Sequence, residues 1–252
     1  MREASRYAVW QVAIMVALFV IWQTLVNVGV LPELLFGRPT KIAESLFNLF
    51  YTGKIYPHLL VTLVETLLAF VIGTLFGLIF GLWLGLNEAA ARLLDPYLKA
   101  ANAMPRVVLA PIFTVWFGLT IWSKVALGVT LVFFIVFFSV YNGVRDANRN
   151  VLASTRMMGA SHTQLIRYFY LPSAMSWVFA SLHASIGMAF VGAVVGEYLG
   201  SARGVGYLIL QAEAVFDINT VFAGIIILTI FALVLDAAVT ILEKRVMKWQ
   251  PI

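Results

Sequence analysis

The sequence predicts an all-α integral membrane protein with six transmembrane helices. The chain has 252 residues, of which 62% are hydrophobic and 12% charged, and its mean hydropathy is +0.95. Soluble domains carry about 25% charged residues. Several apolar runs reach the roughly 20 residues that a helix needs to cross a bilayer. No polar stretch is long enough for a soluble catalytic domain, so we expect residues 1–252 to form a single transmembrane domain.

The apolar runs place the predicted helices in order along the chain. The run that follows Arg2 and Arg6 is too long for a signal peptide, so we expect a retained first helix. The third run is short, and Gly118 and Thr120 separate it from the fourth, which predicts a tight hairpin. The six predicted spans cover residues 8–28, 59–85, 106–120, 123–143, 174–196 and 220–242.

Two connecting segments are amphipathic rather than spanning. Residues 40–50 follow Pro39 and place Ile42, Leu46 and Leu49 on one helical face. We expect this helix to lie at the outer membrane interface. Residues 88–103 have a similar pattern and are expected at the inner interface.

The positive charges predict the orientation of the chain. Cytoplasmic loops of membrane proteins carry an excess of Lys and Arg. With the N-terminus inside, the inner segments hold Arg2, Arg6, Arg92, Lys99, Arg106, Arg145, Arg149, Arg156, Arg167, Lys244, Arg245 and Lys248, and the outer segments hold Arg38, Lys41, Lys54, Lys124 and Arg203. This asymmetry predicts that both termini are cytoplasmic, and it explains the net charge of +5 without a nucleic-acid partner.

Small residues indicate close helix contacts in two spans. Gly73, Gly77, Gly81 and Gly85 recur every four residues and therefore share one helical face. Small residues let membrane helices approach closely, so we expect a packing face, with a pore-lining face as the alternative. The fifth span is also rich in Gly, Ala and Ser, which fits a dimer axis, a translocation path or simple bundle packing.

The sequence lacks the residues that common catalytic and metal sites need. Cysteine is absent, which excludes disulfides, thiolate ligands and cysteine nucleophiles. The three histidines, His58, His162 and His183, have no ligand spacing, so no metal site is expected. The phosphate-binding motif G-x-x-x-x-G-K-[ST] is also missing. We therefore expect a protein that is not an enzyme and that binds no cofactor itself.

A polar segment between the fourth and fifth spans predicts a helical hairpin. Residues 151–158 favour a helix, and Gly159 suits the left-handed residue that ends one. Ser161 and Gln164 then have the spacing of a capping box, which predicts a second helix up to Leu171. Such a hairpin fits a groove in another protein, although a merely solvated hairpin has the same pattern.

The motifs of this chain resemble those of the permease subunits of nitrate/sulfonate/taurine-type ABC importers. Gly159, followed thirteen residues later by Pro172, has the spacing of the "EAA" loop, which falls on residues 153–155 here. The glutamate and both alanines of that motif are replaced, and Phe169 stands where isoleucine is usual. Three further segments resemble family signatures: residues 104–111, residues 116–118 with Ser123 and Lys124, and Gly196-Glu197-Tyr198 with residues 203–207.

The resemblance implies a type I ABC importer permease fold and a set of partners. These are a second permease copy, two ATP-binding subunits that hold ATP and Mg, a periplasmic or lipid-anchored substrate-binding protein, and the lipid bilayer of the bacterial inner membrane. The loop of about residues 144–172 is then the ATPase-docking loop. Its predicted contact residues are Ala153, Ser154, Thr155, Met158, Gly159, Ala160, Ser161, Leu171 and Pro172.

The resemblance also implies a path for a small organic solute. Sulfonate-type members usually carry arginine where Glu65 stands, and the T-x-x-E pattern here is more like the members linked to thiamine-precursor pyrimidines and riboflavin. Glu65 therefore predicts a neutral or weakly charged solute, or else it is a structural ion-pair partner. The predicted path residues are Glu65, Ser181, His183, Ser185, Met188 and Glu197. An ion-coupled secondary transporter is the alternative function, with Glu65 and Asp236 as the candidate coupling carboxylates.

Overall fold

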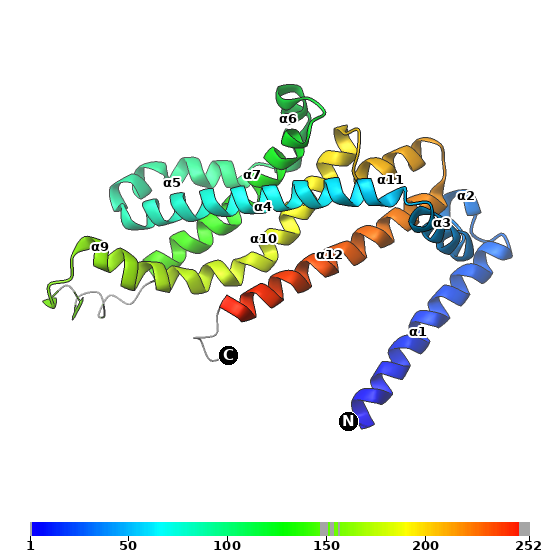
Figure 1. Cartoon of the computed structure of the whole chain (residues 1–252), viewed down its shortest axis with the longest axis horizontal. Helices are drawn as coiled ribbons and strands as arrows, with labels where there is room; N and C mark the ends of the chain where they lie inside the picture. The colour runs from blue at the N-terminus through cyan, green and yellow to red at the C-terminus, as the bar shows by residue number, and fades with distance from the viewer. Residues whose placement is uncertain (1, 147–150, 152–153, 156, 247–252) are drawn as a thin grey trace.

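The structure, a computed structural model, describes residues 2–146, 151, 154, 155 and 157–246, and all regular elements in these residues are helices (Figure 1). Ala153 of the predicted docking loop therefore lies outside the described residues. The elements are α1 (Arg2–Asn27), α2 (Glu33–Phe36), α3 (Pro39–Tyr51), α4 (Ile55–Leu86), α5 (Glu88–Ala103), η1 (Arg106–Leu109), α6 (Ala110–Phe117), α7 (Ile121–Arg145), α9 (His162–Leu165), η2 (Ile166–Tyr170), α10 (Leu171–Gly200), α11 (Val205–Ala214) and α12 (Ile218–Val246).

The number of membrane-crossing helices agrees with the prediction once a bent pair is included. Within the described residues, five helices are long and apolar enough to cross a membrane, or up to six if the bent pair of residues 88–103 and 106–117 counts as one span. The predicted spans at residues 8–28, 59–85, 123–143, 174–196 and 220–242 correspond to α1, α4, α7, α10 and α12.

The predicted third span, residues 106–120, is not a single helix. α6 has eight residues, which is about 12 Å of helix and too short to cross a bilayer. The helix breaks at Pro105, since proline disfavours helical backbone in the residue before it, and Met104 is extended with ψ 132°. α5 and the η1–α6 segment therefore meet at an angle of 84°. One of the six predicted spans is thus a bent pair of shorter helices.

The glycine face of α4 packs directly against α7. A Cβ atom built on Gly73, Gly77, Gly81 or Gly85 would lie 2.7–2.8 Å from a side-chain or backbone atom of α7. The valines of α7 at positions 132, 136, 140 and 144 have the same four-residue spacing. Each opposes one glycine, from Val132 against Gly73 to Val144 against Gly85. This arrangement confirms the predicted packing of the glycine face, with ridges of one helix in the groove of the other.

The order of these contacts also gives the directions of the helices. α4 and α7 run parallel, because both sets of residue numbers ascend together. The chain must therefore return between them, and the bent pair α5–α6 makes that return. α10 is antiparallel to α7, since Gly128 opposes Gly192 while Gly143 opposes Trp177. We call the two ends of this three-helix core the Gly204 end, where α4 and α7 begin, and the Gly159 end, where they finish.

The remaining helices surround the α4–α7–α10 core. α12 lies along α10 and runs antiparallel to it, as the ring contact of Phe190 with Phe231 and the bond of His183 with Asp236 indicate. α1 slants away from the core in Figure 1 and meets the other helices beside α3. There the Thr40 N–H donates to Gln23 Oε1 at 3.2 Å. Most described side chains of α1 are exposed, so this helix packs little against the other described helices.

Candidate functional site

The Gly159 loop, which is the described part of residues 151–170, turns where the sequence predicts. Gly159 has φ +84°, which confirms the left-handed conformation expected of a helix-ending glycine. The Ala160 N–H donates to the Thr155 carbonyl at 3.3 Å and closes the turn. A Cβ built on Gly159 would have no atom of another residue within 4 Å, so the turn is open to the surroundings.

The predicted capping box is also confirmed. The Ser161 N–H donates to Gln164 Oε1 at 2.7 Å, and the Gln164 N–H donates to Ser161 Oγ at 3.3 Å. The helix that begins here continues through the π-helical turn η2 directly into α10. Pro172 therefore lies in the first turn of α10 rather than at a boundary between two helices. The Gly159 loop is thus joined to α10 by continuous helix, so a movement of the loop can be transmitted to α10.

The Gly159 loop encloses a groove of about 450 Å³. Large apolar side chains are exposed on the same loop: Met157 is 84% exposed, Met158 87% and Tyr168 70%. Flexible methionine side chains suit an adaptable contact with another protein. The groove is lined by Val151, Thr155, Met158, Gly159, Ala160, Gln164, Tyr168 and Phe169. Of the predicted docking residues, Thr155, Met158, Gly159 and Ala160 line this groove.

A second polar site lies inside the core at the Gly204 end. Glu197 of α10 is fully buried, and both of its carboxylate oxygens are bonded. Oε1 accepts from Thr62 Oγ1 at 2.6 Å, and Oε2 accepts from the Gly206 N–H at 2.7 Å. Gly204 has φ +114° and no room for a Cβ, because the Glu197 carboxylate occupies that space. Glu197 thereby joins α10, α4 and the start of α11.

Glu65 and Lys124 complete this site, which we call the Lys124 cluster. It consists of Thr62, Glu65, Lys124, Glu197, Gly204 and Gly206. Glu65 is 1% exposed, and its carboxyl group interacts with that of Glu197. Lys124 is 0% exposed and interacts electrostatically with both carboxyl groups. Its Nζ donates to the carbonyls of Leu119 and Thr120 at 3.1 and 3.0 Å.

Burial changes the interpretation of two predicted residues. Lys124 does not belong to an outer loop, as the charge count assumed, because it lies within α7 and is buried. Its long aliphatic stem packs against Gly196, where a Cβ would lie 2.9 Å from Lys124 Cγ. Glu65 is enclosed by helices of its own chain, which argues against a position on the solute path.

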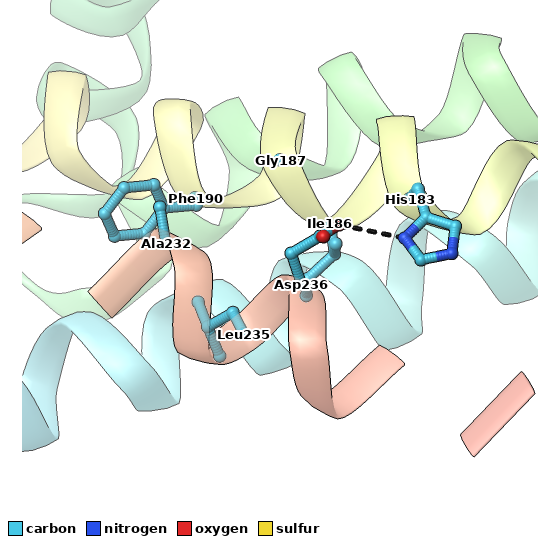
Figure 2. Close-up of a pocket in the computed structure, with 7 residues that line it drawn as sticks. All are labelled: His183, Ile186, Gly187, Phe190, Ala232, Leu235 and Asp236. Atoms are coloured by element: carbon cyan, nitrogen blue, oxygen red, sulfur yellow. Dashed lines mark hydrogen bonds and ion pairs between the residues drawn. The ribbon is translucent and has the colours of Figure 1, made fainter. Parts of the chain in front are cut away.

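The other predicted path residues lie on different sides of α10. Ser181 and Ser185 are buried in the core, and Met188 is half-buried. His183 turns toward α12, where Nδ1 lies 2.8 Å from Asp236 Oδ1 (Figure 2). Its Nε2 lies 3.0 Å from Glu243 Oε2. Figure 2 shows His183 and Asp236 at one end of a small pocket whose remaining lining is apolar. The six residues therefore do not converge on a single surface of this chain.

Sequence reasoning missed most members of the Lys124 cluster. Thr62, Lys124, Gly204 and Gly206 lie in segments that resemble family signatures, yet only Glu65 and Glu197 were assigned to a site. Their positions span from residue 62 to residue 206, so no local spacing connects them. The available signal was the presence of charged residues within otherwise apolar spans, which in membranes are paired or functional.

The helices and the loop define a multi-span membrane protein with an exposed helical loop at one end. A sequence model of the family "Binding-protein-dependent transport system inner membrane component" matches residues 73–248. The chain belongs to this family. It is therefore an inner-membrane component of an ABC transporter, a transport permease rather than an enzyme.

Several curated relatives cover most of the chain. The formylaminopyrimidine transport permease ThiX of Halalkalibacterium halodurans is 33% identical, over 84% of this chain and 82% of the relative. The riboflavin transport system permease RibX of Chloroflexus aurantiacus is 32% identical, over 92% of this chain and 87% of the relative. The putative aliphatic sulfonates transport permease SsuC of Bacillus subtilis is 30% identical, over 91% and 83%. These relatives agree with the family predicted from the sequence motifs.

Solved structures support the predicted fold. An inward-facing structure of the MetNI methionine ABC transporter has a TM-score of 0.65 at 17% identity, and the match covers 75% of this chain and 94% of that chain. An amino acid ABC transporter has a TM-score of 0.62 at 18% identity, with 78% and 96% coverage. The fold is that of the type I ABC importer permeases.

Proposed function

We propose that this chain is the permease subunit of an ATP-driven importer, and that the Gly159 loop is where an ATPase subunit docks. The observation that carries this proposal is the groove of the Gly159 loop. It combines exposed apolar side chains with a helix that continues into the core. ATP and Mg would be bound by the ATPase, and ATP binding would move the loop together with α10. A ligand can drive such a cycle only by interacting differently with the two states.

The complete assembly in this proposal contains further copies and partners. Two permease copies would form the path, with two ATPase subunits on one side and a periplasmic or lipid-anchored binding protein on the other. The exposed face of α10, which includes Ala184 and Gly187, is a surface on which a second copy can pack closely. The ATPase side is the Gly159 end, which together with both termini would face the cytoplasm.

The proposed solute is a small organic molecule. The relatives' names include aliphatic sulfonates, formylaminopyrimidine and riboflavin, so the family alone does not choose among them. The predicted preference for a neutral or weakly charged solute required the Glu65 carboxylate to face the path. Since that carboxylate is buried between helices, Glu65 gives no basis for choosing between a charged and a neutral solute. Thermal-shift screening of the cognate binding protein with taurine, a formylaminopyrimidine and riboflavin would identify its class.

Reconstitution with the cognate ATPase tests the docking proposal. The permease and the ATPase should co-elute, and ATP hydrolysis should increase when the binding protein is added. A permease that neither retains the ATPase nor changes its activity would contradict the proposal. Ion-driven uptake without any ATPase would instead indicate a secondary transporter.

A single cysteine tests the orientation, because the natural chain has none. Ser161→Cys should resist a membrane-impermeant thiol reagent in intact cells and react after the membrane is opened. A cysteine at Lys54, an exposed position at the Gly204 end, should react in intact cells and provides the control. Labelling of the Ser161 position from outside would reverse the proposed topology.

A further inference from the structure

Glu65 has a buried oxygen that lacks a hydrogen-bond partner. Within the described residues, Glu65 Oε2 is one of five buried side-chain nitrogen or oxygen atoms that have no hydrogen-bond partner. A buried acceptor without a partner costs about 1–3 kcal/mol, and more when it is charged. Helix packing alone does not require a carboxyl group here, since an apolar side chain would fill the same space without that cost. The unused oxygen suggests that Glu65 acquires a partner in another state.

Lys124 is the donor that can supply this partner. Its ammonium group interacts electrostatically with Glu65, yet the hydrogen bonds in this structure go to the carbonyls of Leu119 and Thr120. An ammonium is a compact charge on a flexible four-carbon stem and has rotatable donors. The beginning of that stem is fixed between α7 and α10 at Gly196, so the end of the side chain can rotate while the helices stay in contact.

Glu197 is less suited to the same role, because both of its oxygens already accept hydrogen bonds that join three helices. Thr62 and the Gly206 N–H occupy its two oxygens at 2.6 and 2.7 Å. These bonds fix the start of α11 against α4, so breaking them would disturb the backbone of three helices. Among the two acidic members of the Lys124 cluster, Glu65 has the oxygen that is free to receive Lys124.

We propose that Lys124 is a positioning residue that exchanges partners during the transport cycle. In the state described here it holds the carbonyls of the link between α6 and α7. In the other state it pairs with Glu65 and releases that link, so that α6 moves relative to α4. Two discrete arrangements of a buried charge provide the two-state element that a cycle needs. This inference rests on the proposed function, because it assumes an ATP-driven cycle.

The test measures the movement of α6 in the assembled permease–ATPase complex in lipid nanodiscs. Cysteines replace Tyr56 of α4 and Val115 of α6, which are 57% and 83% exposed, and both carry spin labels. The distance between the labels is measured without nucleotide and with ATP, Mg and orthovanadate. In this otherwise natural complex we expect the distance to change when vanadate traps the nucleotide.

Glu65→Gln is the decisive variant. The glutamine amide preserves the size of the side chain and can keep the contact with Glu197, but it presents no carboxylate to Lys124. We expect the thermal midpoint without nucleotide to stay unchanged and the vanadate-dependent change in distance to be lost. Lys124→Met should lose the same change, and the double variant should lose no more than either single variant. Lys54→Met removes an exposed positive charge at the same end and should behave as the natural chain does.

Each other outcome has a defined consequence. If the Glu65→Gln complex shows the same vanadate-dependent change in spin-label distance as the natural complex, the proposal is wrong. This holds even when the thermal midpoint falls, because Glu65 would then have only a structural role. Should Lys124→Met fail to fold, Glu65→Gln decides alone. If the natural chain binds the ATPase, and the label distance changes with vanadate in the natural chain and in both Glu65→Gln and Lys124→Met, only this inference fails. If the natural complex hydrolyses no ATP, the proposed function fails and this inference fails with it.

Discussion

The contact between α4 and α7 and the Gly159 loop use glycine in opposite ways. On α4, each of the four glycines has an atom of α7 within 2.8 Å of the position that a Cβ would take. At Gly159 nothing lies within 4 Å, and the glycine is needed only for its φ of +84°. The first surface is covered by the chain itself, whereas the second remains exposed. A glycine that closes a contact thus contributes to folding, while a glycine that shapes an open turn leaves the surface around it exposed.

The largest effect should come from filling the closed contact. A leucine at Gly77 would meet Val136 Cβ at 2.8 Å and the Phe133 carbonyl oxygen at 2.9 Å, so α7 must move away from α4. We expect Gly77→Leu to destabilise the chain by about 3 kcal/mol or more and to lower the thermal midpoint of the purified protein strongly. Ala89→Leu is the control, since Ala89 of α5 is exposed and lies on no surface proposed for a partner. Equal midpoints for the two variants would contradict the comparison.

A smaller effect on stability, but a large one on assembly, is expected at the open turn. Gly159→Val would force a β-branched residue into the left-handed region, at a cost of roughly 1–2 kcal/mol. The variant should still insert in the membrane and lose ATPase binding, as measured by co-elution. Gly159→Asn should restore much of the binding, because asparagine tolerates this conformation. Normal ATPase stimulation by Gly159→Val would show that the turn is not needed for docking.

The capping box should have an intermediate and local effect. Gln164→Ala removes the acceptor of the Ser161 N–H at 2.7 Å and should cost about 1 kcal/mol of helix stability. We expect weaker ATPase binding with an unchanged thermal midpoint, because the loop unfolds locally before the core does. Hydrogen exchange should increase at residues 161–165 and stay constant in α7. A fall in global stability would mean that the loop is part of the core.

The smallest effect concerns an exposed ion pair outside both regions. The Lys41 ammonium, which bonds to Glu33 at 2.7 Å, and then Arg38 hold the pKa of the Glu33 carboxyl below its ordinary value of 4.5. Because the folded pKa is depressed, the contribution to stability is present above that ordinary value and is lost as the pH falls through the lowered pKa. Glu33→Gln should therefore lower the thermal midpoint slightly at pH 7 and not at pH 3. A difference that persists at pH 3 would exclude this charge effect.

Local features of this fold were predictable because neighbouring residues decide them. The four-residue glycine spacing predicted a packing face, and the Ser161–Gln164 spacing predicted a capping box; both are present. The boundary near Pro105 agrees with the separate elements predicted at residues 88–103 and 106–120, but residues 106–120 do not cross the membrane as one helix. α6 ends at Phe117 after eight residues, and its apolar composition alone does not show that it is so short. The family spacing led to the positions around Gly159, four of which line the groove of the Gly159 loop, and their role in docking stays a prediction.

The sequence by itself determined the membrane class, the helices and the family, because composition, periodicity and motif spacing are properties of short stretches. The tertiary structure decided which helix covers the glycine face of α4 and brought Glu65, Lys124 and Glu197 together. It also showed that Lys124 is a buried group rather than a loop charge. These facts depend on contacts between residues far apart in the chain. Periodicity specifies which side of a helix is small or polar, but only the packing of the whole chain selects the helix that meets that side.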